Sequence, residues 1–211
     1  MQALLYKDWS ILKKTRALYF SLFYFFIIIP TVQKGAFLPE NYSTDFFFIF
    51  VVYLLFSYLT AYDYKYNGHM FVPAFPVSRR KIVEARYAFT TITFLVCLAV
   101  LLVVKAAVLV IGKQQPALQG LIDYEQTGVL FLIFGLFFGV ILPVYYKVGY
   151  QKTRWFMFIA MIVAVVIPSI ITEVVTSLNS PVFTLASMLA AILILLVSLK
   201  VSVNFANSRN V

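Results

Sequence analysis

Long apolar runs separated by short polar segments make up most of the chain. A helix needs about 20 mostly apolar residues to cross the roughly 30 Å hydrocarbon layer of a bilayer. We predict an all-α integral membrane fold, a single bundle of six transmembrane helices covering residues 1–211. The predicted spans are 17–32, 44–62, 87–111, 126–146, 155–178 and 181–203.

The segment before the first span has a different pattern. In residues 1–16, apolar positions alternate with basic ones at helical spacing, and a tryptophan lies at the boundary. This pattern predicts a helix on the membrane surface, held by apolar burial and by anionic headgroups. A basic tail that only follows the charge rule is the alternative. The residues assigned to this interfacial helix are Lys7, Trp9, Lys13 and Lys14.

Two local signals refine the last three spans. Gly135 and Gly139 form a G-x-x-x-G pattern, which lets a second helix approach closely. Pro168 interrupts the fifth span, so that residues 170–178 form either its end or a short re-entrant piece at the outer face. Ser180 followed by Pro181 is a good helix start, a cap with proline in the first helical position.

Composition supports the membrane assignment. Hydrophobic residues make up 63% of the chain and charged residues 12%, whereas soluble domains are about half apolar and a quarter charged. The net charge of +9 does not indicate nucleic acid, because the basic residues lie between apolar spans rather than in a basic domain. The single cysteine, Cys97, lies within an apolar run, which excludes a disulfide framework.

The distribution of Lys and Arg predicts the orientation. With six spans, both termini lie on one side, and fourteen of the 17 Lys and Arg residues fall there. Lys34, Lys105 and Lys113 are the other three. Cytoplasmic loops carry the excess of Lys and Arg. We therefore predict a multi-pass protein of the plasma membrane with both termini in the cytoplasm.

Catalytic signatures are absent from the sequence. A single histidine, His69, excludes H-E-x-x-H, and neither G-x-S-x-G nor G-x-x-x-x-G-K-[ST] occurs. No catalytic, cofactor-binding or metal-binding residue can be named, so a membrane enzyme is the least favoured class. Lys105 and Glu173, the charges nearest to span interiors, lie toward the outer face, which weakens a proton relay. Energy must come from a partner or a gradient.

One long polar stretch, Asp63 to Tyr87, separates the second and third spans. It holds five basic residues, and Asn67-Gly68 and two prolines divide it into short pieces. Ser78 caps the helix that leads into the third span. Three cations in the first turn of that helix oppose its dipole, which indicates a role with lipid phosphates or an acidic protein surface. A basic loop without a partner is the alternative.

The sequence from Phe75 to Tyr87, FPVSRRKIVEARY, together with Asp63 and the basic first helix, resembles the permease subunits of type 2 ATP-binding-cassette (ABC) exporters, the small six-span bacterial kind. The resemblance implies a bacterial plasma-membrane permease, a dimer with a second copy or a paralogue. It also implies separate ABC ATPase subunits that hold ATP and Mg²⁺, while this chain binds no cofactor.

The same resemblance places a short cytoplasmic coupling helix within 66–74, seated in a groove of the ATPase. Met70 and Phe71 would be its apolar plugs, and Pro73 departs from the longer helix usual in the family. The residues assigned to ATPase coupling are Asp63, Tyr66, Asn67, Gly68, His69, Met70, Phe71, Pro76, Ser78, Arg79 and Arg80.

The implied function is export of a hydrophobic or amphipathic substrate, a peptide or antimicrobial, driven by the partner's ATP hydrolysis. A gradient-driven carrier and a small membrane-embedded sensor, both without an ATPase, are the alternatives.

Overall fold

The computed structural model describes residues 2–14, 44–66, 78–111, 124–160 and 181–208. Apart from Tyr66, Ser78 and Gly149, every residue in these ranges is helical, which confirms the all-α prediction for the described part of the chain. A further helical segment covers 150–160. The named helices are α1 (Gln2–Lys14), α3 (Thr44–Lys65), α5 (Arg79–Ile111), α7 (Tyr124–Val148) and α9 (Pro181–Ser208).

Three described segments are long and apolar enough to cross a membrane: Arg79–Val104, Thr127–Val148 and Val182–Ser208. Their length and composition agree with an integral membrane protein. The count of six spans stays a prediction, because residues 17–32 and most of 155–178 lie outside the described ranges. The same holds for the re-entrant piece proposed within 170–178.

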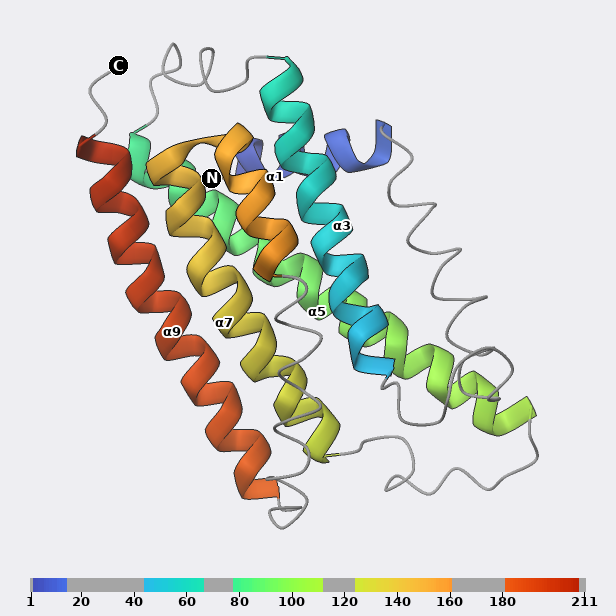
Figure 1. Cartoon of the computed structure of the whole chain (residues 1–211). Helices are drawn as coiled ribbons and strands as arrows, with labels where there is room; N and C mark the ends of the chain where they lie inside the picture. The colour runs from blue at the N-terminus through green and yellow to red at the C-terminus, as the bar shows by residue number, and fades with distance from the viewer. Residues whose placement is uncertain (1, 15–43, 67–77, 112–123, 161–180, 209–211) are drawn as a thin grey trace.

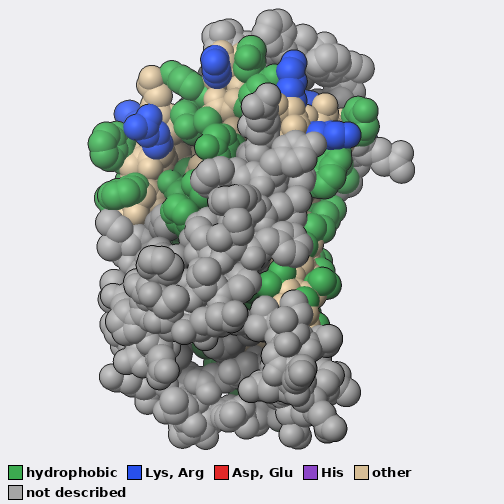
Figure 2. Space-filling view, turned by 90° about the vertical axis from the view of Figure 1, so that its right-hand side faces the viewer, with side chains coloured by type: hydrophobic (Ala, Val, Ile, Leu, Met, Phe, Trp, Pro, Cys, Tyr) green, Lys and Arg blue, Asp and Glu red, His purple; other side chains and the backbone are tan. Residues whose placement is uncertain are grey.

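Several helix ends gather at one end of the bundle. In Figure 1, α3, α7 and α9 all finish at the end of the bundle where α1 lies and where α5 begins. Figure 2 shows described Lys and Arg side chains gathered near that same end. The structure thus places the basic first helix and both flanks of the polar stretch together, as the positive-inside pattern requires of one membrane face.

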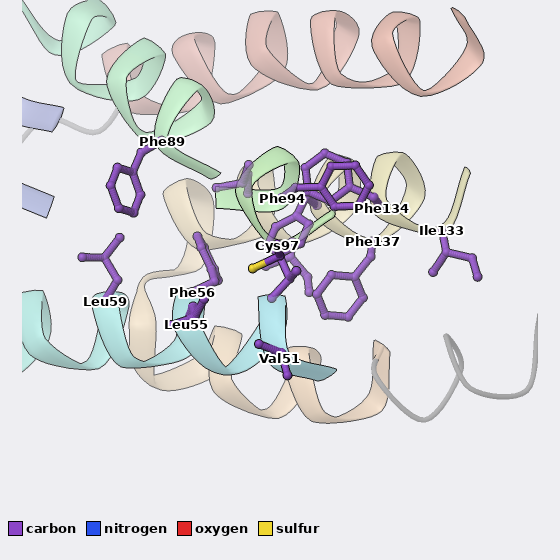
Figure 3. Packing of buried hydrophobic residues seen from close by; sticks show 14 of the residues in the cluster. Val51, Leu55, Phe56, Leu59, Phe89, Phe94, Cys97, Ile133, Phe134 and Phe137 are labelled. Atoms are coloured by element: carbon purple, nitrogen blue, oxygen red, sulfur yellow. The ribbon is translucent and has the colours of Figure 1, made fainter. Parts of the chain in front are cut away.

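Aromatic and branched side chains of α3, α5 and α7 fill the core between these helices. Phe94 of α5 stacks on Phe134 of α7 with ring centroids 3.9 Å apart, and Phe56 of α3 meets Phe138 edge-on at 5.3 Å (Figure 3). Such ring pairs stabilise the packing beyond the contribution of the apolar area that they bury. Cys97 is buried in this cluster as a small apolar side chain.

The helices α7 and α9 pack closely along their length. A Cβ on Gly135 would lie 2.8 Å from Cα of Ala191, and one on Gly139 would lie 2.6 Å from Cγ2 of Ile194. The two glycines predicted to permit close approach therefore face α9, where a side chain would not fit beside the Ala191 backbone. Van der Waals packing of small residues is a main attraction between helices in lipid.

The two faces of α9 differ in residue size. Its buried positions lie three, four or seven residues apart, on one helical face, and carry small side chains, whereas large aliphatic side chains point outward. In a bilayer, large aliphatic side chains can face the lipid tails without a cost in free energy, because the tails are equally apolar. Small side chains allow close contact between helices and therefore occupy the buried face. The buried set is Thr184, Ser187, Ala191, Ser198 and Ser202, and the exposed set includes Val182, Leu185, Leu189, Leu193 and Val197.

A single glycine joins α7 to the segment 150–160. Gly149 has a φ of 85°, in the left-handed region that L side chains rarely adopt. Its N–H donates to the Tyr145 carbonyl at 3.0 Å, and its own carbonyl accepts from the N–H of Thr153 at 3.1 Å. Glycine therefore permits the abrupt change of direction at this end of the bundle.

Candidate functional site

The face of the first helix that packs on the bundle carries both apolar and charged side chains. Ile11 and Leu12 of α1 are buried in the core cluster with residues of α3 and α5, and Asp8 on the same face is 3% exposed. Trp9 is about half exposed, and Lys13 and Lys14 are exposed. Among the described residues, the exposed face of α1 is therefore the one with Trp9 and the two lysines, and its contact with a membrane surface stays a prediction.

Four charged side chains meet where α1, α3 and α5 come together. Arg86 of α5 donates through Nη2 to Oδ2 of Asp63, at the end of α3. Its Nη1 lies 3.5 Å from Oδ2 of Asp8. Lys7 donates through Nζ to Oδ1 of Asp63 at 3.1 Å and lies 3.5 Å from Oδ1 of Asp8. We call Lys7, Asp8, Asp63 and Arg86 the charge cluster.

Burial makes this cluster a costly arrangement that must be paired. Arg86 is 7% exposed and Asp63 is 8% exposed, while the Lys7 side chain is about one-third exposed. Removing buried charges from water costs several kcal/mol per ion, and removing one partner leaves the other uncompensated at about 3–5 kcal/mol. The two carboxylates and the guanidinium thus depend on one another, and Lys7 lies at the rim.

The two carboxylates respond differently to this environment. Burial raises the pKa of Asp8 above its ordinary value of 3.8, and the attraction of Arg86 and Lys7 does not offset it. For Asp63, one residue past the predicted span 44–62, burial also acts to raise the pKa, but the charges and hydrogen bonds of Arg86 and Lys7 lower it overall. Asp63 is therefore the main anionic partner of the two cations.

Two atoms of the cluster have incomplete pairing. Among the described residues, Oδ1 of Asp8 and Nη1 of Arg86 are buried without a hydrogen-bond partner. A buried polar network in which every member is satisfied is stabilising, and a partly satisfied one is less so. The contact between Asp8 and Arg86 is therefore an attraction of charges without a well-formed hydrogen bond, which makes it the weaker link.

The cluster joins both flanks of the polar stretch. Asp63 precedes residues 67–77 and Arg86 follows them, while Lys7 and Asp8 belong to α1. The ion pairs hold the end of α3, the start of α5 and the first helix as one unit. A displacement applied to 67–77 would therefore reach three helices together.

The remaining predicted coupling residues fall in two groups. Tyr66 is exposed beyond the end of α3, with its ring centroid 4.4 Å from that of Tyr62. Ser78 directly precedes α5, and its carbonyl accepts from the N–H of Ile82 at 3.3 Å, as expected of a residue at the cap. Outside the described residues lie Asn67, Gly68, His69, Met70, Phe71 and Pro76, and with them the proposed coupling helix.

The first two arginines of α5 have partners within the chain. Arg79 donates through Nη1 to the carbonyl of Ala206 in α9 at 3.2 Å. Arg80 forms an ion pair with Glu84 one turn later, at 2.7 Å between Nε and Oε1. Exposed pairs of this kind contribute little to stability, so the Arg80 guanidinium stays available at the surface.

Sequence reasoning missed two members of the cluster, Asp8 and Arg86. The signal for Asp8 was present: it lies four residues from Leu4 and four from Leu12, so a helix places this acid on the apolar face. A buried acid requires a cation. Arg86 directly precedes the predicted span 87–111 and lies within the apolar helical segment Arg79–Val104. Charged residues in such segments pair with one another or mark function.

The described residues contain no group of three or more His, Cys, Asp and Glu side chains that could hold a metal ion. What the charge cluster can do chemically is hold and reposition helices. A helical membrane protein whose basic first helix is tied by ion pairs to both flanks of one polar stretch has an organisation that suits a transporter subunit.

The comparison with protein families agrees with this class. The family model described as ABC-2 family transporter protein matches residues 3–207, nearly the whole chain. The chain belongs to this family and is a membrane subunit of an ABC transporter, a class that works with ABC ATPase subunits. No curated protein and no solved structure matches the chain.

Proposed function

We propose that this chain is the permease subunit of an ATP-driven exporter in a bacterial plasma membrane. It works as a dimer with a second copy or a paralogue, and separate ATPase subunits hydrolyse ATP. The charge cluster is the observation that carries the proposal, because it ties both flanks of residues 67–77 to α1. A hydrophobic or amphipathic substrate, a peptide or antimicrobial, fits the apolar spans.

The proposed mechanism follows from these ion pairs. Residues 67–77 contact the ATPase, with Met70 and Phe71 as apolar anchors. Closure of the two ATPases displaces this segment, and the pairs of Arg86 with Asp63 and Asp8 pass the displacement to α1, α3 and α5. The weak contact between Asp8 and Arg86 is the one that can break and reform as the helices shift, because it lacks a full hydrogen bond.

The location of the buried charges argues against the gradient-driven alternative. Among the described residues, the buried Asp8, Asp63 and Arg86 all lie at the α1 end of the bundle. A gradient-driven carrier places its coupling and substrate sites near the bilayer midplane. The observed position instead suits contact with a partner at the membrane face.

Purification from the native host in mild detergent, followed by mass spectrometry, tests the partnership. We expect a nucleotide-binding subunit at one copy per permease. Met70→Asp or Phe71→Asp should abolish its recovery, because a charge in an apolar groove costs binding. Ser208→Asp, on the exposed end of α9, is the matched control and should retain the ATPase.

The variants must first give the size-exclusion profile of the parent, which shows that they fold. A homo-oligomer without an ATPase from the wild-type chain would overturn the exporter and favour a carrier or sensor. Undiminished recovery of the ATPase with both aspartate variants would overturn the coupling segment.

Growth inhibition tests the substrate class. Cells expressing the complex should tolerate severalfold higher concentrations of at least one cationic amphipathic peptide or antimicrobial than cells without it. An ATPase subunit that cannot hydrolyse ATP should remove the protection. Protection that persists with this inactive subunit would contradict ATP-driven export, and a full panel without any protection would contradict the substrate class.

A further inference from the structure

A second polar network connects α5, α7 and α9. The Tyr87 hydroxyl lies 2.6 Å from Oγ of Ser198 and 2.7 Å from Oγ of Ser202. Ser198 in turn donates to the carbonyl of Gly139 at 2.7 Å. Tyr87, Ser198 and Ser202 are all buried, so these hydroxyls rely on one another for partners.

Counting protons gives this network one direction. The single hydroxyl proton of Ser198 is used on the Gly139 carbonyl. Tyr87 must therefore donate to Ser198, and Ser202 must donate to Tyr87, since each hydroxyl carries one proton. The resulting chain runs from Ser202 through Tyr87 and Ser198 to the Gly139 carbonyl. Each hydroxyl fixes the orientation of the next.

The carbonyl that ends this series of hydrogen bonds lacks its usual helical donor because of a proline. In an α-helix the carbonyl of residue 139 accepts from the N–H of residue 143. Residue 143 is Pro143, which lies inside α7 and has no N–H. The Gly139 carbonyl is thus the one that proline releases from the helical ladder. Ser198 of the neighbouring helix replaces the missing donor, as hydroxyls do at prolines in membrane helices.

Gly139 also makes this replacement possible in space. The approach of Ile194 leaves no room for a Cβ at residue 139, and the same close approach puts Ser198 within hydrogen-bond distance of the Gly139 carbonyl. A proline and a glycine four residues apart weaken the ladder of α7 at one level, which is where helices bend.

We propose that Ser198 and Tyr87 are positioning residues that restrain bending of α7 at Pro143, Ser198 by bonding the released Gly139 carbonyl and Tyr87 by orienting Ser198. Tyr87 directly follows Arg86 of the charge cluster. A shift of the start of α5 therefore moves the Tyr87 hydroxyl and changes the bond that restrains α7. This last step rests on the proposed exporter function, whereas the restraint itself does not.

A double-mutant cycle on the purified chain in detergent tests the restraint. Ser198→Ala should lower the unfolding temperature by about 2–4 °C. In a Pro143→Ala background the same substitution should have a clearly smaller effect, because residue 143 then supplies its own N–H to the Gly139 carbonyl. What remains is the cost of removing the acceptor of the Tyr87 hydroxyl. Ser187→Ala is the matched control: this buried serine donates to the Thr184 carbonyl within α9, so its effect should be equal in both backgrounds.

Spin labels separate control of the bend from simple packing. Labels at Leu136→Cys and Lys147→Cys lie on either side of Pro143, on a chain with Cys97→Ala. Ser198→Ala and Tyr87→Phe should broaden the distance distribution between the labels. Ser198→Thr, which keeps a hydroxyl, and Ser187→Ala should leave it narrow. Adding Pro143→Ala to the Ser198→Ala chain should narrow the distribution again.

Equal effects of Ser198→Ala in both backgrounds, or an unchanged distance distribution, would overturn the proposal. In the assembled complex, a non-hydrolysable ATP analogue should shift the label distance, and Tyr87→Phe should abolish that shift. An absent shift in the wild-type complex, with the double-mutant cycle intact, would count against the exporter function and leave the restraint of α7 standing.

Discussion

At the scale of single residues, the chain buries charge at only one end of its described helices. Asp63 and Asp8 share the guanidinium of Arg86, yet they do not share it equally, because Asp63 holds hydrogen bonds from both cations and Asp8 does not. The pKa of Asp63 lies below 3.8 and that of Asp8 above it. Two acids a short distance apart therefore contribute to stability in opposite senses.

This difference predicts opposite pH dependences for two neutral variants. A lowered pKa in the fold means that Asp63 stabilises above pH 3.8 and loses this contribution as pH falls. The raised pKa of Asp8 means that its contribution is present below pH 3.8 and lost as pH rises through its folded pKa. Relative to Asp63→Asn, the wild-type chain should gain unfolding temperature with rising pH. Relative to Asp8→Asn, the unfolding temperature of the wild-type chain should fall with rising pH.

Thermal unfolding in detergent from about pH 3 to pH 7 measures both differences. The double variant Asp8→Asn with Asp63→Asn is the control, because it removes both titrations and leaves the slope of the remaining groups. Slopes of the same sign for the two single variants would contradict the assigned roles.

At the scale of elements, the pair α7 and α9 is the tightest contact, and small residues produce it. At Gly135 the obstacle to a side chain is the backbone of Ala191, which cannot move without separating the helices. At Gly128 the neighbours are the Phe183 ring and Oγ of Ser187, both 3.0 Å away, and side chains can rotate. The same substitution thus meets a rigid neighbour at one position and an adjustable one at the other.

Gly135→Ala should therefore destabilise the chain by about 1–3 kcal/mol, the usual cost of overpacking, despite the better helix propensity of alanine. Gly128→Ala, on the same helix, should cost clearly less. Chemical or thermal unfolding of the two purified variants gives the comparison. A larger loss for Gly128→Ala, or none for either, would show that the spacing of α7 and α9 is not set by backbone contact.

At the scale of the whole molecule, α1, the end of α3, the start of α5 and the end of α9 gather at one end of the bundle. Charge asymmetry predicts that this end faces the cytoplasm. The charge cluster and the cations of the polar stretch then lie where a soluble ATPase can reach them. The orientation is thus a requirement of the proposed function as well as of the charge rule.

Cysteine labelling in intact cells measures the orientation. On a chain with Cys97→Ala, Lys14→Cys and Ser208→Cys should react with a membrane-impermeant maleimide only after the cells are opened. Gln114→Cys, in the predicted outer loop 112–125, should react in intact cells. Labelling of Ser208→Cys from outside would contradict the topology and with it the access of an ATPase to the cluster.

The sequence by itself determined the class of protein and predicted its orientation in the membrane. The cost of moving a residue from water to hydrocarbon is nearly additive along a run, so the apolar runs predicted the helices at 44–62, 87–111, 126–146 and 181–203 without knowledge of contacts. The structure contains helices over all four, each extended at one or both ends. The positions of Lys and Arg and the FPVSRRKIVEARY sequence then indicated the family.

The tertiary structure alone decided which polar residues meet. Asp63 stood out in the sequence because it closes a span, but nothing local paired it with Arg86, 23 residues later, or with Lys7 of α1. Likewise, the position of Pro143 in the sequence predicts that the Gly139 carbonyl lacks its helical donor. Only the packing of the helices shows that the Ser198 hydroxyl donates to this carbonyl instead. Such contacts depend on how each helix is rotated about its axis, and that rotation is set by the fit between neighbouring helices, which uniformly apolar runs do not encode.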